Sequence, residues 1–380
     1  MQIQQQSWNA YNGWTVERNE NFTFAKPALV LAFGNRFELE KEERFIELQN
    51  FYPNSHIILN STSGEIIGTE VKDGSIVVTA IQFEHTTYEV AVENIKNWES
   101  SYAVAKQLVS RFEQTDLRHI FVVSDGQLVN GSELVKGFND SLSDGITVTG
   151  GLAGDDARFQ KTLVGMNNQP SEGNIVAIGF YGEQLKVGYG SVGGWNSFGP
   201  ERIITKSKGN VLYELDGQSA LAIYKKYLGP KAEGLPSTAL LFPLSIRLHD
   251  DEKSLVRTIL AIDEEEQSMT FAGDMPEGTK ARLMKANFDK LIDGAYDSAN
   301  SCLLPLENQE AEIALLVSCV GRKLVLDQRI EEEVEGVVEV VGNKAVVTGF
   351  YSYGELAPFA GYLNCELHNQ TMTVTLLGEK

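Results

Sequence analysis

The sequence predicts a mixed α/β (α+β) protein of two lobes, in which mixed or antiparallel sheets pack against helices. Up to about residue 145, apolar runs typical of buried strands alternate with amphipathic segments of helical period. After residue 160, short strands follow one another across short turns, which join antiparallel strands more easily than parallel ones. A chain of 380 residues also exceeds what one hydrophobic core usually supports, which favours two domains.

The first part of the chain has the alternation of strands and helices that is typical of α/β units. Strands are predicted at 28–33, 55–59, 75–83 and 119–126. Helices are predicted at 38–51, 98–112 and 130–142. The last helix begins near Asn130 or Ser132, because both residue types are favourable N-caps.

The remainder of the chain is richer in short strands. Strands are predicted at 160–166, 174–180, 184–192, 202–207, 211–217, 238–246, 254–262, 268–273, 312–318, 344–353 and 371–377. Helices are predicted at 218–228, with Asp216 as cap, at about 279–298, and at 319–341. The stretch 229–237 holds two glycines and two prolines and predicts a domain boundary. We therefore expect an N-terminal extension (1–25), an N-terminal domain (26–229) and a C-terminal domain (230–380).

Composition excludes several classes of partner and location. The formal net charge of −20 is spread along the chain and repels nucleic acid and anionic membranes. There is no apolar run long enough to span a bilayer, and the first residues lack the basic and apolar regions of a signal peptide. The three cysteines have no paired short spacing, so neither a zinc cluster nor a disulfide framework is indicated. We expect a cytoplasmic protein.

A glycine followed by an acid recurs after apolar strands, at Gly64-Glu65, Gly154-Asp155 and Gly354-Glu355, with a weaker instance at Gly273-Asp274. At any one place, the glycine can supply a positive φ and the acid can cap the turn. The recurrence favours internal duplication, which by itself says nothing about function.

Five short motifs, in this order, resemble the FIST family of signal-transduction sensory proteins, with an N-terminal and a C-terminal FIST region in tandem. They are "GGLAGD" (150–155), "GYGSVGGW" to "ELDG" (188–217), "SCVGR" (318–322), "GFYSYGELAP" (349–358) and "LHNQT" (367–371). The resemblance covers the chain from about residue 26 to residue 377.

This resemblance implies a cytoplasmic sensor that binds a small molecule, with amino acids proposed as ligands. It also implies a separate output partner, such as a histidine kinase, a cyclase or a chemoreceptor. No cofactor is expected in the first interpretation. The alternative is a nitric-oxide sensor that holds haem non-covalently through a single histidine, for which His368 is the candidate. The ordinary interpretation of His368 is a hydrogen-bonded turn residue. A third alternative for the whole protein is an interaction module without a ligand.

The acids and one arginine suit a zwitterionic ligand. Asp155 and Glu355 would bind an ammonium group, because a charge-assisted hydrogen bond is about twice as strong as a neutral one. The guanidinium of Arg322 would hold a carboxylate through two parallel hydrogen bonds. The alternative is that Arg322 pairs with Glu355 or Asp155 inside the protein and no ligand enters.

Other residues complete the predicted ligand site. Cys319 is a candidate reactive thiol, because a helix N-terminus and Arg322 would lower its pKa, although such a cysteine is more often a small buried hydrophobe. Aromatic rings beside glycines would line a pocket. The predicted ligand-binding set is Gly150, Gly151, Gly154, Asp155, Trp195, Cys319, Arg322, Tyr351, Tyr353 and Glu355.

An enzyme is not expected. The sequence contains hydroxyl groups at Ser124 and Ser318, but no Gly-x-Ser-x-Gly elbow and no motif that places a base beside a nucleophile.

Overall fold

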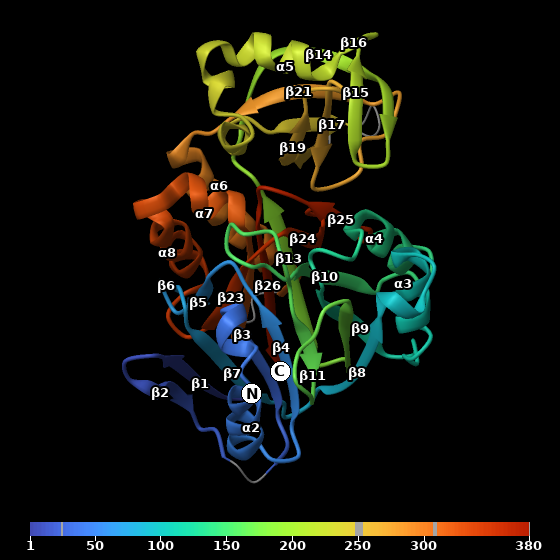
Figure 1. Ribbon diagram of the computed structural model, residues 1–380. Coiled ribbons are helices and arrows are strands. Elements are labelled where there is room, and N and C mark those ends of the chain that lie inside the picture. The colour runs from blue at the N-terminus through green and yellow to red at the C-terminus, as the bar shows by residue number, and fades with distance from the viewer. Residues whose placement is uncertain (24–25, 248–253, 307–309, 380) are drawn as a thin grey trace.

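The computed structural model describes residues 1–23, 26–247, 254–306 and 310–379, which form a body and an upper lobe (Figure 1). The body contains three six-stranded sheets, and the upper lobe, residues 196–285, contains an eight-stranded sheet and α5 (Ala220–Leu228). Both parallel and antiparallel pairs occur, and helices pack against the sheets. The predicted mixed α+β architecture in two lobes is confirmed.

Each sheet of the body is built around one strand-helix-strand repeat with a parallel pair. The first repeat contains β3 (Leu29–Gly34), α1 (Arg36–Leu39), α2 (Glu42–Phe51) and β4 (His56–Ser61). The second contains β9 (Leu117–Ser124), α4 (Gly131–Asn139) and β10 (Thr147–Leu152). The third contains β22 (Ile313–Cys319), α7 (Val320–Leu326), α8 (Ile330–Val341) and β23 (Val346–Ser352). The predicted duplication is therefore a threefold repetition.

Five strands have the same order in the three sheets, and the sixth strand lies at one edge or the other. The first strand of each parallel pair also pairs with an antiparallel strand: β7 (Ile76–Gln82), β12 (Asn174–Tyr181) or β26 (Met372–Glu379). Beyond these lie β1 (Gln2–Asn9) with β2 (Gly13–Glu20), β8 (Thr87–Asn94) and β13 (Leu185–Val192). The residues predicted as an N-terminal extension thus contribute two strands to the first sheet.

The three repeats exchange strands in a cycle. The strand that follows each parallel pair joins the sheet of another repeat: β5 (Glu65–Ile67) beside β23, β24 (Gly354–Pro358) beside β10, and β11 (Val164–Met166) beside β4. Two sheets end in a further strand, β6 (Glu70–Lys72) or β25 (Cys365–His368). Because each repeat completes its neighbour's sheet, the ends of the parallel strands from all three repeats are brought close together.

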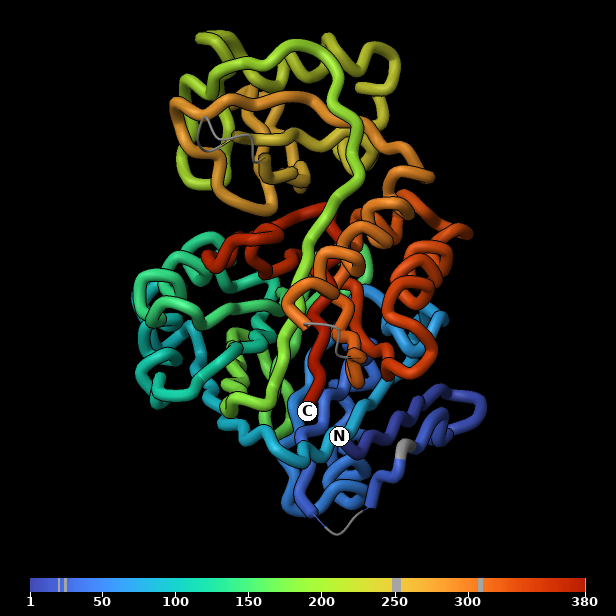
Figure 2. The backbone as a smooth tube through the Cα atoms, turned by 180° about the vertical axis from the view of Figure 1, so that it is seen from behind, coloured from blue at the N-terminus to red at the C-terminus, as the bar shows by residue number. Residues whose placement is uncertain are grey.

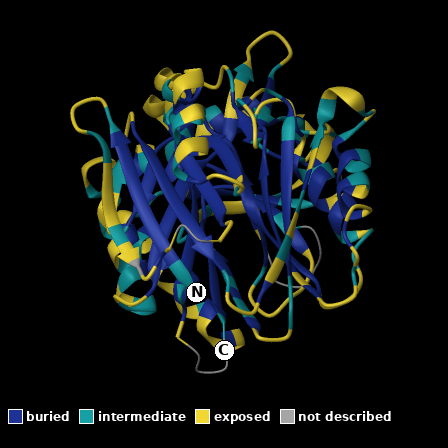
Figure 3. Cartoon of the chain, turned by 90° about the horizontal axis from the view of Figure 1, so that it is seen from below, coloured by how far each residue is buried: buried dark blue, intermediate teal, exposed yellow. Residues whose placement is uncertain are grey.

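One apolar core joins the inner faces of the three sheets, and Figure 3 shows the buried strands at the centre with exposed helices and loops around them. Phe33, Phe121 and Phe350 represent the three sheets in this core, and the rings of Phe33 and Phe350 lie 4.9 Å apart. The outer faces are covered by α2, by α3 (Ser101–Val109) with α4, and by α6 (Phe288–Leu303) with α8. This burial fixes the positions of the loops at the strand ends.

The upper lobe is inserted between β13, an edge strand of the third sheet, and α6, which covers that sheet. Figure 2 shows the chain rising from β13 into β14 of the upper lobe. Its strands are β14 (Asn196–Lys208), β15 (Val211–Leu215), β16 (Gln218–Ser219), β17 (Leu244–Arg247), β18 (Leu255–Arg257), β19 (Ile259–Asp263), β20 (Ser268–Phe271) and β21 (Lys280–Lys285). The stretch 229–237, predicted as a domain boundary, follows α5 within this lobe and begins with a 3-10 helix at Gly229–Gly234.

Three local predictions were wrong in this region. Residues 238–241, predicted as the start of a strand, belong to a 3-10 helix (Ser237–Leu241), and the strand begins at Leu244. Residues 280–285, predicted as helix, form β21, because its backbone pairs with β14 and β17 on its two sides. The cap of α5 is Ser219, whose hydroxyl accepts a hydrogen bond from the Ala222 N–H, in place of Asp216. The predicted cap Asn130 of α4 is confirmed.

Candidate functional site

The loops just beyond the parallel strands of the three repeats meet through equivalent hydrogen bonds. Each loop donates one backbone N–H to a carbonyl of a neighbouring repeat: Ser63 to Tyr351 at 2.8 Å, Gly154 to Ser61 at 3.0 Å and Tyr353 to Leu152 at 3.1 Å. This ring of bonds makes Ser63, Gly154 and Tyr353 equivalent positions and locks the loops to one another.

Two of the recurring acids have the same buried role. Glu65 accepts hydrogen bonds from the hydroxyls of Thr62 and Ser75 and from the Ser75 N–H, at 2.5, 2.6 and 3.3 Å. Glu355 accepts them from the Ser352 hydroxyl and from the hydroxyl and N–H of Thr371, at 2.8, 2.9 and 3.1 Å. Removal from water raises the pKa of each glutamate to about 8. Both side chains therefore hold turns inside the body.

The second repeat departs from this arrangement. Glu65, Glu355 and Val164 pair with Phe350, Gly151 and Asn60, which are equivalent positions of the three sheets. Val164 is thus the counterpart of the two glutamates, and residues 155–162 form an additional loop inserted before it. Gly154-Asp155 is therefore not equivalent to the other two glycine-acid pairs, although the sequence suggested this. Gly273-Asp274 lies in the upper lobe after β20.

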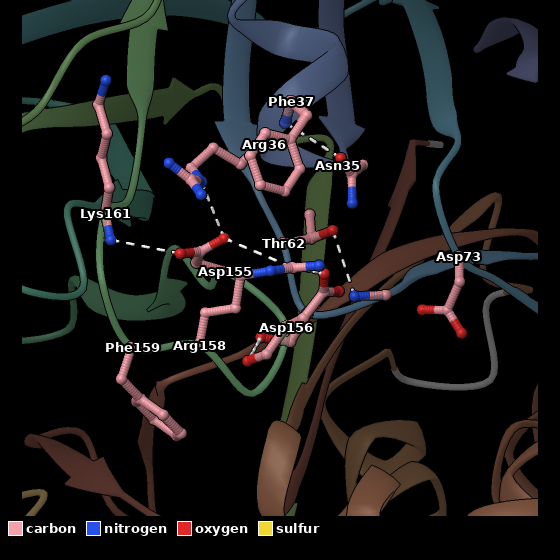
Figure 4. Close-up of polar contacts among 12 residues, drawn as sticks. Asn35, Arg36, Phe37, Thr62, Asp73, Asp155, Asp156, Arg158, Phe159 and Lys161 are labelled. Carbon is pink, nitrogen blue, oxygen red and sulfur yellow. Dashed lines mark hydrogen bonds and ion pairs between the residues drawn. The ribbon is translucent and has the colours of Figure 1, made fainter.

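Asp155 anchors this 155–162 loop to the first repeat, as Figure 4 shows. Its buried carboxylate accepts a hydrogen bond from Arg36 Nε at 2.9 Å and one from the Lys161 N–H at 3.3 Å. Arg36 lies on α1, so the ion pair connects two repeats. The anchor leaves Asp156 and Arg158, which follow it, at the edge of a cavity.

This polar cavity has a volume of about 560 Å³ and contains both signs of charge. It is lined by Asn35, Ser63, Asp73, Gly74, Asp156, Ala157, Arg158, Val320, Lys323 and Leu324. Arg158 forms an ion pair with Asp156, and Lys323 forms one with Asp73. Lys323 Nζ also donates to the Ser63 carbonyl at 2.7 Å. Two cations and two carboxylates thus line one cavity with no net charge among them.

A second cavity, of about 650 Å³, lies between the body and the upper lobe and is here termed the interlobe cavity. The body contributes residues 126–131 and the rings of Phe159 and Tyr353, which stack with centroids 4.4 Å apart. The upper lobe contributes Leu240, Leu260 and Phe271, among others. Ala157 and Leu324 line both cavities, so the cavities adjoin at these residues.

Of the ten predicted ligand residues, Tyr353 lines the interlobe cavity, and the glycines have a packing role. A Cβ on Gly150 would lie 1.9 Å from the Val122 carbonyl oxygen. A Cβ on Gly151 would meet Val317 at 2.5 Å, and one on Gly154 would meet the Ser63 hydroxyl at 2.3 Å. These glycines allow the sheets and loops to approach closely.

Arg322 is fully buried and pairs with a residue that the sequence did not suggest. Its Nε and one terminal nitrogen donate to the Glu333 carboxylate at 2.8 and 2.6 Å, and its remaining donors bind the carbonyls of Gly193 and Leu291 at 2.5 and 2.7 Å. Tyr351, also buried, donates to Glu333 at 2.7 Å. The predicted alternative, a pair with Glu355 or Asp155, is therefore wrong, and the guanidinium donates four hydrogen bonds within the protein.

The remaining candidates are also engaged in internal contacts. Burial raises the pKa of the Cys319 thiol above its usual value, so the predicted lowering of this pKa was wrong. Trp195 Nε1 donates to the Gln370 carbonyl at 2.9 Å. His368 is buried, its Nε2 lies 3.0 Å from the Ala357 carbonyl, and burial lowers its pKa to about 4. His368 lines neither cavity.

The charged residues of the polar cavity are not in the predicted ligand set. Asp156 and Arg158 lie one and three positions after Asp155, and Lys323 directly follows Arg322, so each is close in sequence to a residue of the predicted set. Asp73 lies between β6 and β7, far along the chain from the others, and no pattern in the sequence indicates it.

Within residues 1–23, 26–247, 254–306 and 310–379, no three histidine, cysteine, aspartate or glutamate side chains are grouped as metal ligands. In the same ranges, no helix combines the length and apolar character needed to cross a membrane.

Comparisons with known proteins cover nearly the whole chain. The family model of the FIST N domain matches residues 28–218, and that of the FIST C domain matches residues 220–358. The uncharacterized protein MJ1623 of Methanocaldococcus jannaschii is 23% identical over an alignment of 374 positions, which covers 90% of this chain and 68% of that protein. A crystal structure of a cyanuric acid hydrolase from A. caulinodans matches 78% of this chain and 99% of that one, at 11% identity and a TM-score of 0.20.

Proposed function

The chain belongs to the FIST family, whose domains are signal-transduction sensory domains, and we propose that it senses a small zwitterionic metabolite, such as an amino acid, bound in the polar cavity. The observation that carries this proposal is the presence of Arg158, Lys323, Asp73 and Asp156 around one cavity. The zwitterion expected from the sequence is kept, and its partners are reassigned to these four side chains.

Charge balance supports a zwitterion over a simple ion. The ligand carboxylate would bind Arg158 and Lys323, while its ammonium group would bind Asp156 and Asp73. Each protein charge thereby exchanges one partner for another, so none of these four charges is left unpaired. A simple anion would leave the two aspartates without partners in a chain whose net charge is already −20.

The proposed role is binding and not catalysis, with the signal passed to a separate partner protein, such as a kinase, a cyclase or a chemoreceptor. A ligand changes a signal only if it binds two states of the protein with different affinity. The 155–162 loop is suited to couple the two cavities, because Asp156 and Arg158 line the polar cavity while Phe159 lines the interlobe cavity.

Thermal unfolding of the protein with each of the twenty common amino acids tests this proposal. A binding amino acid at 100 times its dissociation constant is expected to add about 2.7 kcal/mol to the free energy of unfolding and raise Tm. Lys323→Met is expected to abolish the increase, because it removes one carboxylate partner. Lys344→Met is the matched control, since Lys344 is an exposed lysine paired with Glu310.

Two results would contradict the proposal. The first is a wild-type Tm that no amino acid raises. The second is an increase of equal size in Lys323→Met, which would place the bound amino acid outside the polar cavity.

A further inference from the structure

The adjoining cavities point to the chemical class of the ligand. We propose that the ligand is an amphipathic zwitterion, with its charged head in the polar cavity and an aromatic or long aliphatic body in the interlobe cavity. This inference rests on the proposed function, because it assumes that the head binds Arg158 and Lys323. Ala157 and Leu324 line both cavities, so a molecule that passes these two side chains contacts both.

The walls of the interlobe cavity are suited to an apolar body. Leu128, Leu260 and Leu324 line it and are 45%, 42% and 43% exposed, so each leaves apolar surface in contact with water. Phe159 is 37% exposed, and its ring is held parallel to that of Tyr353 within 16°. An aromatic or aliphatic group that covers these surfaces removes them from water, which is favourable in proportion to the area buried.

The stacked rings are also held in place before any ligand binds. The Phe159 N–H donates a hydrogen bond to the Tyr353 hydroxyl at 3.0 Å. The Tyr353 hydroxyl in turn donates one to the Asp156 carbonyl at 3.2 Å. The ring wall and the start of the charged loop are therefore joined by hydrogen bonds. Preorganised walls of this kind lose little side-chain freedom on binding, which favours affinity.

The apolar part of the ligand would contact both the body and the upper lobe of the protein. Leu128 belongs to the body of the protein, while Leu260 and Phe271 belong to the upper lobe. Among the described residues, the hydrogen bonds that join the lobes beside this cavity include one from Arg257 to the Leu367 carbonyl at 2.9 Å, one from Asn130 Nδ2 to an Asp274 carboxylate oxygen at 3.4 Å and one from the Asp274 N–H to the Ser132 hydroxyl at 3.4 Å. An apolar group of the ligand placed between the lobes therefore adds contacts across their interface, whereas a ligand consisting of the head alone does not.

Calorimetric titration with L-phenylalanine and L-alanine tests the inference, because the two probes share the charged head. L-Phenylalanine is expected to bind at least tenfold more tightly, since its ring buries apolar surface that the methyl group does not. Phenethylamine and 3-phenylpropionate, which each lack one charge of the head, are expected to bind at least tenfold more weakly than L-phenylalanine.

A pair of leucine variants locates the apolar body. Leu260→Asn makes one wall of the interlobe cavity polar and is expected to reduce the affinity for L-phenylalanine at least fivefold while leaving that for L-alanine unchanged. Leu303→Asn is the matched control, because Leu303 is 38% exposed and lines neither cavity. It is expected to change neither affinity.

The outcomes separate this inference from the proposed function. Equal affinities for L-phenylalanine and L-alanine, or a Leu260→Asn variant that affects both amino acids alike, would overturn the inference and leave the sensing of zwitterions intact. Binding of neither amino acid, together with a flat response across the whole amino-acid panel, would overturn both.

Discussion

Replacing Arg322 by methionine is expected to lower the free energy of unfolding by about 3–5 kcal/mol, the usual cost of breaking a buried ion pair by removing one partner. Both Arg322 and Glu333 are fully buried. The variant leaves the Glu333 carboxylate with hydrogen bonds from Ser318 and Tyr351 but without its cation. It also removes two hydrogen bonds that Arg322 of α7 donates. One goes to the Gly193 carbonyl, in the connection to the upper lobe, and the other to the Leu291 carbonyl of α6.

Urea unfolding of three variants measures this effect. Arg329→Met is the control, because Arg329 forms exposed ion pairs with Asp289 and Glu332, and its loss is expected to change stability little. Arg322→Met combined with Glu333→Gln is expected to recover part of the loss, since the uncompensated charge is then gone. An Arg322→Met variant as stable as the Arg329→Met control would show that the buried pair contributes nothing to the fold.

Stability is expected to fall as the pH rises from 6.5 to 8, because of Glu65 and Glu355. The pKa of each is raised to about 8 in the folded protein, well above its value in the unfolded chain. In this interval the folded state holds a proton that the unfolded state has released, so raising the pH favours unfolding. Each glutamate is expected to account for about 1.5 kcal/mol between pH 6.5 and 8.

Two buried histidines change stability in the opposite direction, mainly below pH 6.5. Burial lowers the pKa of His119 to about 3 and that of His368 to about 4, so these histidines stay neutral in the folded protein. Below pH 6.5 the unfolded chain gains protons at both histidines, and stability is lost as the pH falls. Above pH 6.5 this contribution is small, so the glutamates dominate among these four groups.

Glu355→Gln provides the test, because glutamine resembles the protonated carboxyl group and cannot ionise. Chemical unfolding of wild type and variant at pH 6.5, 7.25 and 8 is expected to show a shallower pH dependence in the variant. The Glu65→Gln variant is expected to behave likewise, since its hydrogen bonds are equivalent. Parallel pH profiles for wild type and both variants would contradict this account of the buried glutamates.

The repeating fold was accessible to sequence reasoning because its signals are local. The apolar runs at β3, β9 and β22 have the pattern of buried strands, and the helices between them have a helical period. The segment 280–285 was misassigned because its strand character depends on pairing with β14 and β17. Such pairing joins residues far apart in sequence and overrides local preference.

The candidate site was less accessible, because it depends on three-dimensional register. Consecutive residues on a helix point about 100° apart, so Arg322 is buried against Glu333 while Lys323 lines the polar cavity. The sequence showed that this segment contains cationic side chains, but it did not show whether Arg322 or Lys323 faces the cavity. The glycine-acid pattern likewise concealed the 155–162 loop, whose insertion appears only when strand pairs of the three repeats are compared.

A crystal structure of the protein with L-phenylalanine tests the central claim most directly. The account predicts the carboxylate of L-phenylalanine within hydrogen-bonding distance of Arg158 or Lys323, its ammonium group beside Asp156 or Asp73, and its ring in the interlobe cavity. L-Phenylalanine bound at another place, at a concentration that raises Tm in solution, would contradict it.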